Sequence, residues 1–224
     1  MNANDGARRI ASMAFACVFG IGATDAAHAQ DIPGYPRAAE ALDLREVALL
    51  PRYCNYTQMF REKVPGGNDS AVINGWYAQL GPTFNHMHHY CLGLMKNNRA
   101  MFLARDHVVR QFYLGAAIVE FDYVIDRAPA DFILLPEIIT KKGEALIQLG
   151  KGPVAVLEFL RAIDLKNDYW PPYAYLSDYY KETGEMAKAR ESLENGLAHS
   201  PDAKALQRRL SELESAPTRR STKR

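Results

Sequence analysis

Residues 136–169 read PEIITKKGEALIQLGKGPVAVLEFLRAIDLKNDY, and residues 170–203 read WPPYAYLSDYYKETGEMAKARESLENGLAHSPDA, so the two stretches are equally long at 34 residues. Small residues, large apolar residues and a glycine return in the same order in both. The matched pairs are Gly143 and Ser177, Leu146 and Tyr180, Gly150 and Gly184, Ala155 and Ala189, Phe159 and Leu193, and Ala162 and Gly196. Self-similarity at a fixed period of this length is the signature of stacked repeat architectures.

The spacing of apolar residues within the first copy predicts a helical hairpin. Apolar residues recur every three or four positions over 135–149 and again over 154–165, and Gly150 and Gly152 interrupt the pattern between them. The second copy opens with Pro171 and Pro172, which the first turn of a helix tolerates. A hairpin of this kind leaves one apolar face uncovered, so we expect neighbouring hairpins to stack.

This pattern resembles the tetratricopeptide repeat (TPR). Pro201 falls where that family places its closing proline, and Asn167 stands at the corresponding position of the preceding copy. The resemblance implies an all-α fold, an α-α superhelix in which helical hairpins stack as a TPR-like solenoid, here of the exported bacterial type. It assigns one repeat to residues 136–169 and one to residues 170–203.

The remaining segments are interpreted around these two repeats. Residues 86–131 form a degenerate first repeat with a lengthened helix or an insertion, and residues 204–214 a capping helix. Residues 30–85 form an N-terminal helical cap, in which the pattern predicts helix over 38–61 except at Pro51 and a second short helix beginning at Asp69 or Ser70. Residues 215–224 are expected to be a disordered basic tail.

The first 29 residues have the layout of a secretory signal peptide. A short segment with Arg8 and Arg9 precedes an apolar stretch, and the leader ends in Ala-His-Ala before Gln30. The apolar stretch is shorter than the about 20 residues of a membrane-spanning helix, so we expect cleavage near Ala29 and no stable membrane insertion afterwards. An uncleaved anchor, twin-arginine export and lipid attachment at Cys17 are the alternatives. The leader favours a periplasmic or secreted protein of a Gram-negative bacterium.

Removal of the leader leaves two cysteines, Cys54 and Cys91. Two cysteines in an oxidising compartment predict one disulfide, which would restrict the unfolded chain by about 4 kcal/mol in the loop-entropy description. Two buried thiols are the alternative. The bridge would clip the N-terminal cap onto the first repeat. The sequence has no Cys-x-x-Cys motif, so it indicates neither a thioredoxin-like centre nor covalent haem attachment.

Composition and motifs argue against several classes of function. Lys and Arg number 27 against 26 Asp and Glu, for a net charge of +1, so no overall field attracts nucleic acid. The chain has no Gly-rich phosphate loop, Gly-x-Ser-x-Gly elbow or His-Glu-x-x-His helix. Isolated acidic pairs such as Glu120 and Asp122 are interpreted as solvated helix faces. We therefore expect no enzyme activity and no cofactor.

His86, His88 and His89, with Cys91, are the candidate metal-binding cluster. Neutral imidazoles suit zinc or copper. On a helix, however, no single face gathers more than about two of these side chains. We interpret them as histidines that are buried among Tyr90 and neighbouring aromatic residues and donate to backbone or carboxylate, and we predict no metal site. A metal-binding envelope protein is kept as the alternative function.

The resemblance also implies a binding surface, because in TPR proteins the first helix of each repeat lines a concave groove for an extended peptide or a partner helix. The family's groove positions carry over to Thr140, Glu144, Gln148, Ala174, Asp178, Lys181 and Glu182. The subfamily that clamps a C-terminal carboxylate has lysine where this chain has Thr140 and Ala174, and asparagine where it has Glu144 and Asp178. Acidic side chains favour basic or neutral ligands, unless they only keep the surface hydrated.

Tyrosines after Trp170 provide candidate contacts for a partner. By register Tyr173 and Tyr180 are packing positions, which leaves Tyr175 and Tyr179 as exposed anchors. The sequence thus predicts an exported interaction scaffold, or an assembly accessory in the cell envelope, with a protein or peptide partner.

Overall fold

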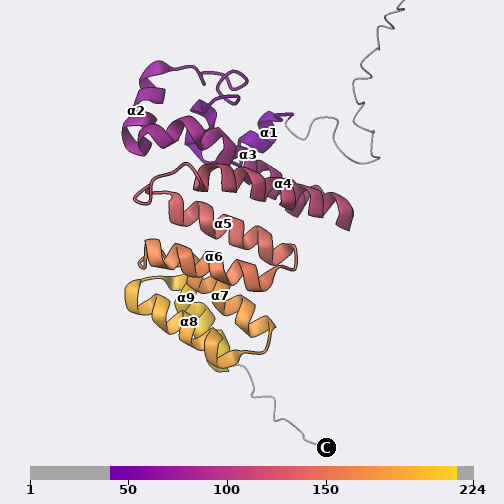
Figure 1. The fold of residues 1–224 in the computed structure, drawn as a ribbon, viewed down its shortest axis with the longest axis vertical. Helices are drawn as coiled ribbons and strands as arrows, with labels where there is room; N and C mark the ends of the chain where they lie inside the picture. The colour runs from indigo at the N-terminus through magenta and orange to yellow at the C-terminus, as the bar shows by residue number, and fades with distance from the viewer. Residues whose placement is uncertain (1–40, 216–224) are drawn as a thin grey trace, which may run out of the picture. The chain divides into compact units, whose positions relative to one another are not determined.

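The computed structural model describes residues 41–215, and in that part of the chain every regular element is a helix (Figure 1). The α-helices are α1 (Leu44–Val47), α2 (Ser70–Leu80), α3 (Met87–Phe102), α4 (His107–Ile125), α5 (Leu135–Gln148), α6 (Gly152–Leu165), α7 (Pro171–Glu182), α8 (Met186–His199) and α9 (Lys204–Ser215). Two 3-10 helices, η1 (Arg52–Tyr56) and η2 (Gly81–His86), lie between α1 and α3. The predicted signal peptide lies outside the described residues, as does the predicted basic tail beyond Ser215.

Consecutive helices pair into hairpins, and the hairpins stack. Helix α3 packs on α4, α5 on α6, and α7 on α8, while α5 also packs against α4 and α7 against α6. Helix α9 packs on α8 and α7. Figure 1 shows this succession from α3 down to α8. The predicted TPR-like α-α superhelix is therefore confirmed. In the described range, no helix has the length and apolar character needed to span a membrane.

The two glycine turns predicted from the repeat occupy equivalent corners. Gly150 follows α5 with φ +72°, and Gly184 follows α7 with φ +83°, a left-handed conformation that favours glycine. In both turns the backbone N–H of the next residue donates to the carbonyl five residues earlier, over 2.9 Å in the first and 2.7 Å in the second. This is the Schellman arrangement that ends a helix.

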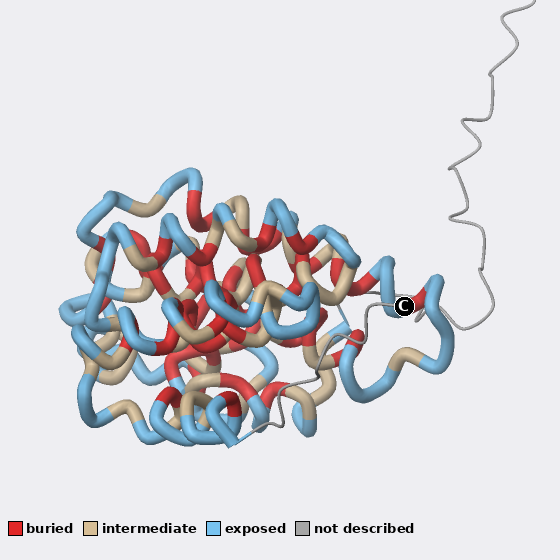
Figure 2. Tube along the Cα trace, turned by 90° about the horizontal axis from the view of Figure 1, so that it is seen from below, coloured by how far each residue is buried: buried red, intermediate tan, exposed pale blue. Residues whose placement is uncertain are grey.

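An aromatic ring packed onto a glycine joins the two helices of a hairpin. A Cβ atom on Gly143 would lie 2.4 Å from the ring of Phe159, and a Cβ on Gly93 would lie 2.4 Å from the ring of Phe121. Both rings are fully buried. Figure 2 shows that the buried segments of the helices are gathered on the inside of the molecule. The α3–α4 hairpin therefore has the same core contact as the α5–α6 hairpin, although its second helix is longer: α4 has 19 residues and α6 has 14.

The N-terminal segment is less helical than the sequence predicts. Of the expected helix over 38–61, the described part forms only the short α1 and η1, joined and followed by turns. Pro51 lies at the break between them and disfavours helical backbone in the residue before it. Cys54 and Phe60 are both fully buried in the same apolar cluster, whereas a straight helix would point residues six apart in different directions. Cys54 forms a disulfide with Cys91, which ties η1 to α3.

Helix α2 begins as the sequence predicts. The side chain of Asp69 accepts hydrogen bonds from the backbone N–H groups of Ala71, at 2.9 Å, and Val72, at 3.2 Å. This N-cap satisfies donors that the first turn of a helix leaves free.

We predict that the disulfide carries a measurable part of the stability. Replacing both cysteines, Cys54→Ala with Cys91→Ala, removes the cross-link between residues 37 apart and should lower the free energy of unfolding by about 2–4 kcal/mol. Urea denaturation monitored by circular dichroism measures the free energy of unfolding. Wild-type protein under reducing conditions is the control and should lose a similar amount. Equal stability with and without the bridge would contradict this assignment.

We also predict opposite effects of one substitution at two helical glycines. Gly143→Ala forces its methyl group into the ring of Phe159 and should destabilise the protein by about 1–2 kcal/mol. Gly115→Ala in α4 meets no atom within 4 Å and should stabilise by about 0.5–1 kcal/mol through helix propensity. Urea midpoints of the two variants test this, and a gain of stability at Gly143 would refute the close packing.

Candidate functional site

The side chains on one side of α5 and α7 form the candidate binding surface. On α5, positions 137, 141, 144 and 148 recur at three- and four-residue spacing and therefore share a side of the helix. We call this surface the A-helix face, because the first helix of each repeat, α5 or α7, carries most of it. Its residues are Glu137, Lys141, Glu144, Gln148, Tyr169, Tyr175, Asp178 and Arg209.

The predicted groove residues fall into three degrees of exposure. Thr140 and Ala174 are buried, at 2% and 3% exposed, and the Thr140 hydroxyl donates to the carbonyl of Pro136 over 2.7 Å. Both side chains therefore take part in packing within the stack. Those of intermediate exposure are Glu144, Gln148, Tyr175 and Asp178, and the exposed ones are Lys181 and Glu182.

Two of the predicted carboxylates are paired within the chain. Lys141 Nζ lies 2.8 Å from Glu144 Oε2, and Arg209 Nη2, from α9, lies 3.1 Å from Asp178 Oδ2. Each pair balances its own charge. The sequence gives no signal for the second pair, because its partners lie 31 residues apart on different helices.

Glu137 differs from these two carboxylates. The hydroxyl of Tyr90, from α3, donates to Glu137 Oε1 over 2.6 Å. The ion pairs of residues 41–215 join Glu144 and Asp178 to cations but do not include Glu137. The A-helix face therefore has one half-buried carboxylate that is held by a phenol and is not neutralised by a cation of the described chain.

The charge of Glu137 also acts on two tyrosines besides Tyr90. Burial, with the charge of Glu137 as the second cause, raises the pKa of Tyr53. Burial and then the charges of Glu137 and Glu144 raise the pKa of Tyr169. Burial is the larger cause of the raised pKa values, and the nearby negative charge adds to it because it disfavours a second negative charge.

The sequence contained part of the signal for this cluster. Tyr53 and Tyr90 directly precede Cys54 and Cys91, so the predicted disulfide also brings the two tyrosines together. Glu137 lies seven residues before Glu144, two helical turns away on the same side of α5. Nothing in the sequence indicates that Tyr169, in the connection between α6 and α7, lies near both carboxylates.

The two tyrosines predicted as exposed anchors are half-buried. The ring of Tyr175 stacks on Phe159, with centroids 5.3 Å apart and an interplanar angle of 8°. The ring of Tyr179 lies over Gly152, where a Cβ atom would come within 2.2 Å of it. Each ring has a packing role and keeps only part of its surface available for a partner.

The interpretation of Glu120 as a solvated residue is wrong. Glu120 is 8% exposed, and its carboxylate binds Lys96 Nζ at 2.6 Å and His89 Nδ1 at 2.5 Å. A buried carboxylate requires such partners, and here α3 supplies both. Asp122 is half-buried and pairs with Lys142 at 2.8 Å.

The three clustered histidines are half-buried rather than buried, and they contact backbone, carboxylate and aromatic groups of the chain, as the sequence interpretation expects. His88 Nδ1 lies 3.1 Å from the carbonyl of Asn85, and the ring of His89 stacks on Tyr123 at 3.6 Å. Burial, followed by the charge of His89, lowers the pKa of His88. Among residues 41–215, no three His, Cys, Asp or Glu side chains lie close enough together to hold a metal ion.

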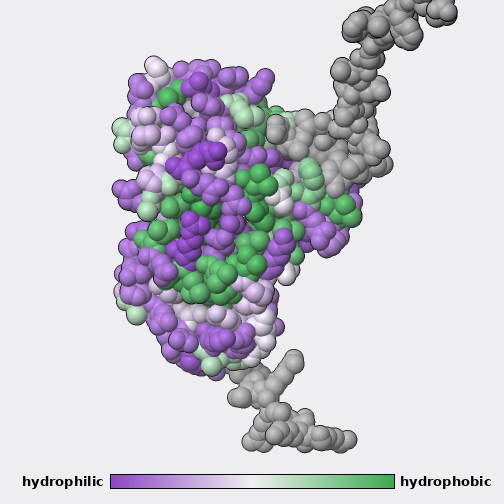
Figure 3. Space-filling view, in the orientation of Figure 1, coloured by the Kyte–Doolittle hydropathy of each residue, from purple (hydrophilic) through white to green (hydrophobic). Residues whose placement is uncertain are grey.

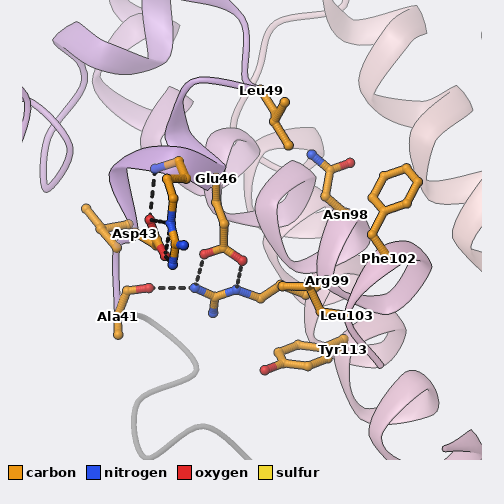
Figure 4. A pocket seen from close by; sticks show the side chains of 11 residues that line it. Ala41, Asp43, Glu46, Leu49, Asn98, Arg99, Phe102, Leu103 and Tyr113 are labelled. Carbon is orange, nitrogen blue, oxygen red and sulfur yellow. Dashed lines mark hydrogen bonds and ion pairs between the residues drawn. The ribbon is translucent and has the colours of Figure 1, made fainter. Parts of the chain in front are cut away.

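A cavity of about 540 Å³ lies between α1 and the adjoining ends of α3 and α4 (Figure 4). Its apolar lining includes Leu49 and Phe102. The guanidinium of Arg99 donates to both carboxylate oxygens of Glu46, at 2.8 and 2.6 Å, and to the carbonyl of Ala41 at 2.6 Å. These bonds hold α1 against α3, so the cavity wall has a structural role.

Apolar side chains are also exposed on α4 and α6. Val119 is 68% and Leu157 is 65% exposed, and Figure 3 shows apolar surface over these helices. This surface is a second place where a partner can contact the stack.

We predict a large difference between two arginines that line the cavity. Arg99→Met leaves Glu46 without its buried partner and should lower the free energy of unfolding by about 3 kcal/mol. Arg45→Met removes an ion pair whose arginine is 91% exposed and should cause no measurable loss. Urea denaturation of both variants measures the difference; similar losses would show that the Arg99 pair does not anchor α1.

No family model matches the chain, and no curated protein matches it. Among solved structures, the chain is similar to "First TPR of Spaghetti (RPAP3) bound to HSP90 peptide SRMEEVD", at 18% sequence identity and a TM-score of 0.41, over 55% of this chain and 92% of that chain.

Proposed function

We propose that this chain is an exported interaction scaffold without catalytic activity, and that an extended segment of a protein partner binds along its A-helix face. The observation that carries the proposal is the composition of that face. Tyrosine rings and carboxylates from two neighbouring hairpins lie there half-exposed, and rigid aromatic groups beside polar ones are typical of binding surfaces.

The stack suits such a role because its helices fix the side chains in place. Tyr175 is held by Phe159, and Asp178 by Arg209. A surface that is already ordered loses little conformational entropy when a partner binds. A segment lying across α5 and α7 would contact both repeats at once.

We place the protein in the periplasm or outside the cell, acting in the cell envelope. The layout of residues 1–29 supports export, and the Cys54–Cys91 disulfide is the kind of bond that an oxidising compartment maintains.

Site-specific photo-crosslinking in envelope preparations tests the surface. A photoreactive phenylalanine analogue replaces Glu182, next to the A-helix face, or Leu157, on the apolar surface of α6; Glu194 on α8 is the exposed control. We expect one discrete crosslinked partner from position 182 and none from position 194.

The charges of the face provide a second measurement. Glu144→Lys and Asp178→Lys each replace a carboxylate of the face with a cation next to Lys141 or Arg209. The added positive charge should repel a basic partner segment and weaken the position-182 crosslink at least about fivefold. A discrete crosslink from position 157 with none from position 182 would instead move the docking site to α6 and refute the proposal.

A further inference from the structure

We propose that Glu137, with Tyr53, Tyr90 and Tyr169, forms a site for a primary ammonium group, such as a lysine side chain of the partner segment. The inference rests on the proposed function, because it assigns the chemistry of one position in the bound segment. It reverses the charge preference of carboxylate-clamp TPR proteins at this end of the face.

The charges of the A-helix face leave Glu137 without a counter-ion in the described part of the chain. Glu144 is paired with Lys141 and Asp178 with Arg209, whereas Glu137 accepts a neutral phenol hydroxyl. Lys141, one turn along α5, is engaged by Glu144 at 2.8 Å. A carboxylate that is partly removed from water and lacks a counter-charge attracts a cation more strongly than a fully solvated one.

Two phenols of neighbouring segments respond to the charge of Glu137. The charge of Glu137 makes tyrosinate formation harder at both Tyr53 and Tyr169. The electrostatic potential that disfavours an added anion at these oxygens stabilises an added cation there. Tyr53 belongs to η1 and Tyr169 to the α6–α7 connection, whereas Glu137 itself belongs to α5. The negative potential therefore acts on two segments besides α5.

The hydroxyl oxygen of Tyr53 is a buried polar atom without a hydrogen bond. Tyr53 is 9% exposed, and its hydroxyl oxygen has no hydrogen-bond partner in the described part of the chain. Native structures have few such atoms, and each requires an explanation. The charge of Glu137 also acts on this phenol, and its free oxygen can accept an N–H from a cation bound at the carboxylate.

The arrangement suits an ammonium better than other cations. Oε1 of Glu137 already accepts from Tyr90, so the two-oxygen fork that matches a guanidinium is half occupied. An ammonium offers three N–H donors around a compact charge, which the second carboxylate oxygen and phenol oxygens can accept. A single carboxylate is too few ligands for Ca²⁺, which takes six to eight oxygens.

The test titrates the full chain with N-acetyl-lysine methylamide, and with the norleucine and arginine analogues, by NMR at low ionic strength. We expect saturable shifts with the lysine probe, centred on Tyr90 and Tyr169, and none with norleucine. The arginine probe should bind more weakly than the lysine probe. Added salt should weaken binding through screening.

Glu137→Gln removes the charge and keeps an oxygen that can accept from Tyr90, so it should weaken the lysine probe at least about tenfold. Glu194→Gln, at an exposed glutamate on α8 away from this surface, is the matched control and should change nothing. Tyr169→Ala, in the connecting segment, is the second variant if Glu137→Gln lowers stability, and should also weaken binding.

Equal affinities of wild type and Glu137→Gln, or equal affinities for lysine and norleucine, would overturn the site. This failure is distinguishable from failure of the proposed function. A crosslink at position 182 that persists in Glu137→Gln while the lysine probe does not bind removes only the ammonium site. If no crosslink forms from position 182 in otherwise wild-type protein, the docking surface itself is refuted.

Discussion

The contact between an aromatic ring of one helix and a glycine of its partner sets the spacing of the stack. Phe121 on Gly93 and Phe159 on Gly143 place ring atoms where any side chain would stand. Helix axes can approach this closely only if one of the two residues lacks a Cβ. Because the second helix of each hairpin packs on this side of the first, another side of α5 and α7 is left to carry polar and aromatic groups.

The sequence predicts those parts of the fold in which local pattern and tertiary packing agree. The 34-residue step, the glycine turns and the apolar periodicity all describe neighbours along the chain, and the structure has them. The N-terminal segment follows another rule, since Cys54 and Phe60 reach the same core only along an irregular path. Local periodicity favoured a helix there because it does not include that requirement.

The candidate site was only partly predictable for a related reason. Carry-over of family positions identified Glu144 and Asp178 but not their cations, and it passed over Glu137. Whether a carboxylate is neutralised depends on residues far away in sequence, such as Arg209 for Asp178. Glu120 shows the same effect, because its helix-surface pattern does not indicate that Lys96 and His89 of α3 bury it.

The disulfide makes the two ends of the stack unequal. In a solenoid held only by contacts between neighbours, a terminal unit can detach without disturbing the rest. Here residues 54–91 form a covalently closed loop that contains α2 and reaches into α3, whereas α8 and α9 rely on packing and surface ion pairs. We therefore expect local opening to start from α9 and proceed toward α7, and the hairpin nearest the bridge to be the last to lose its order.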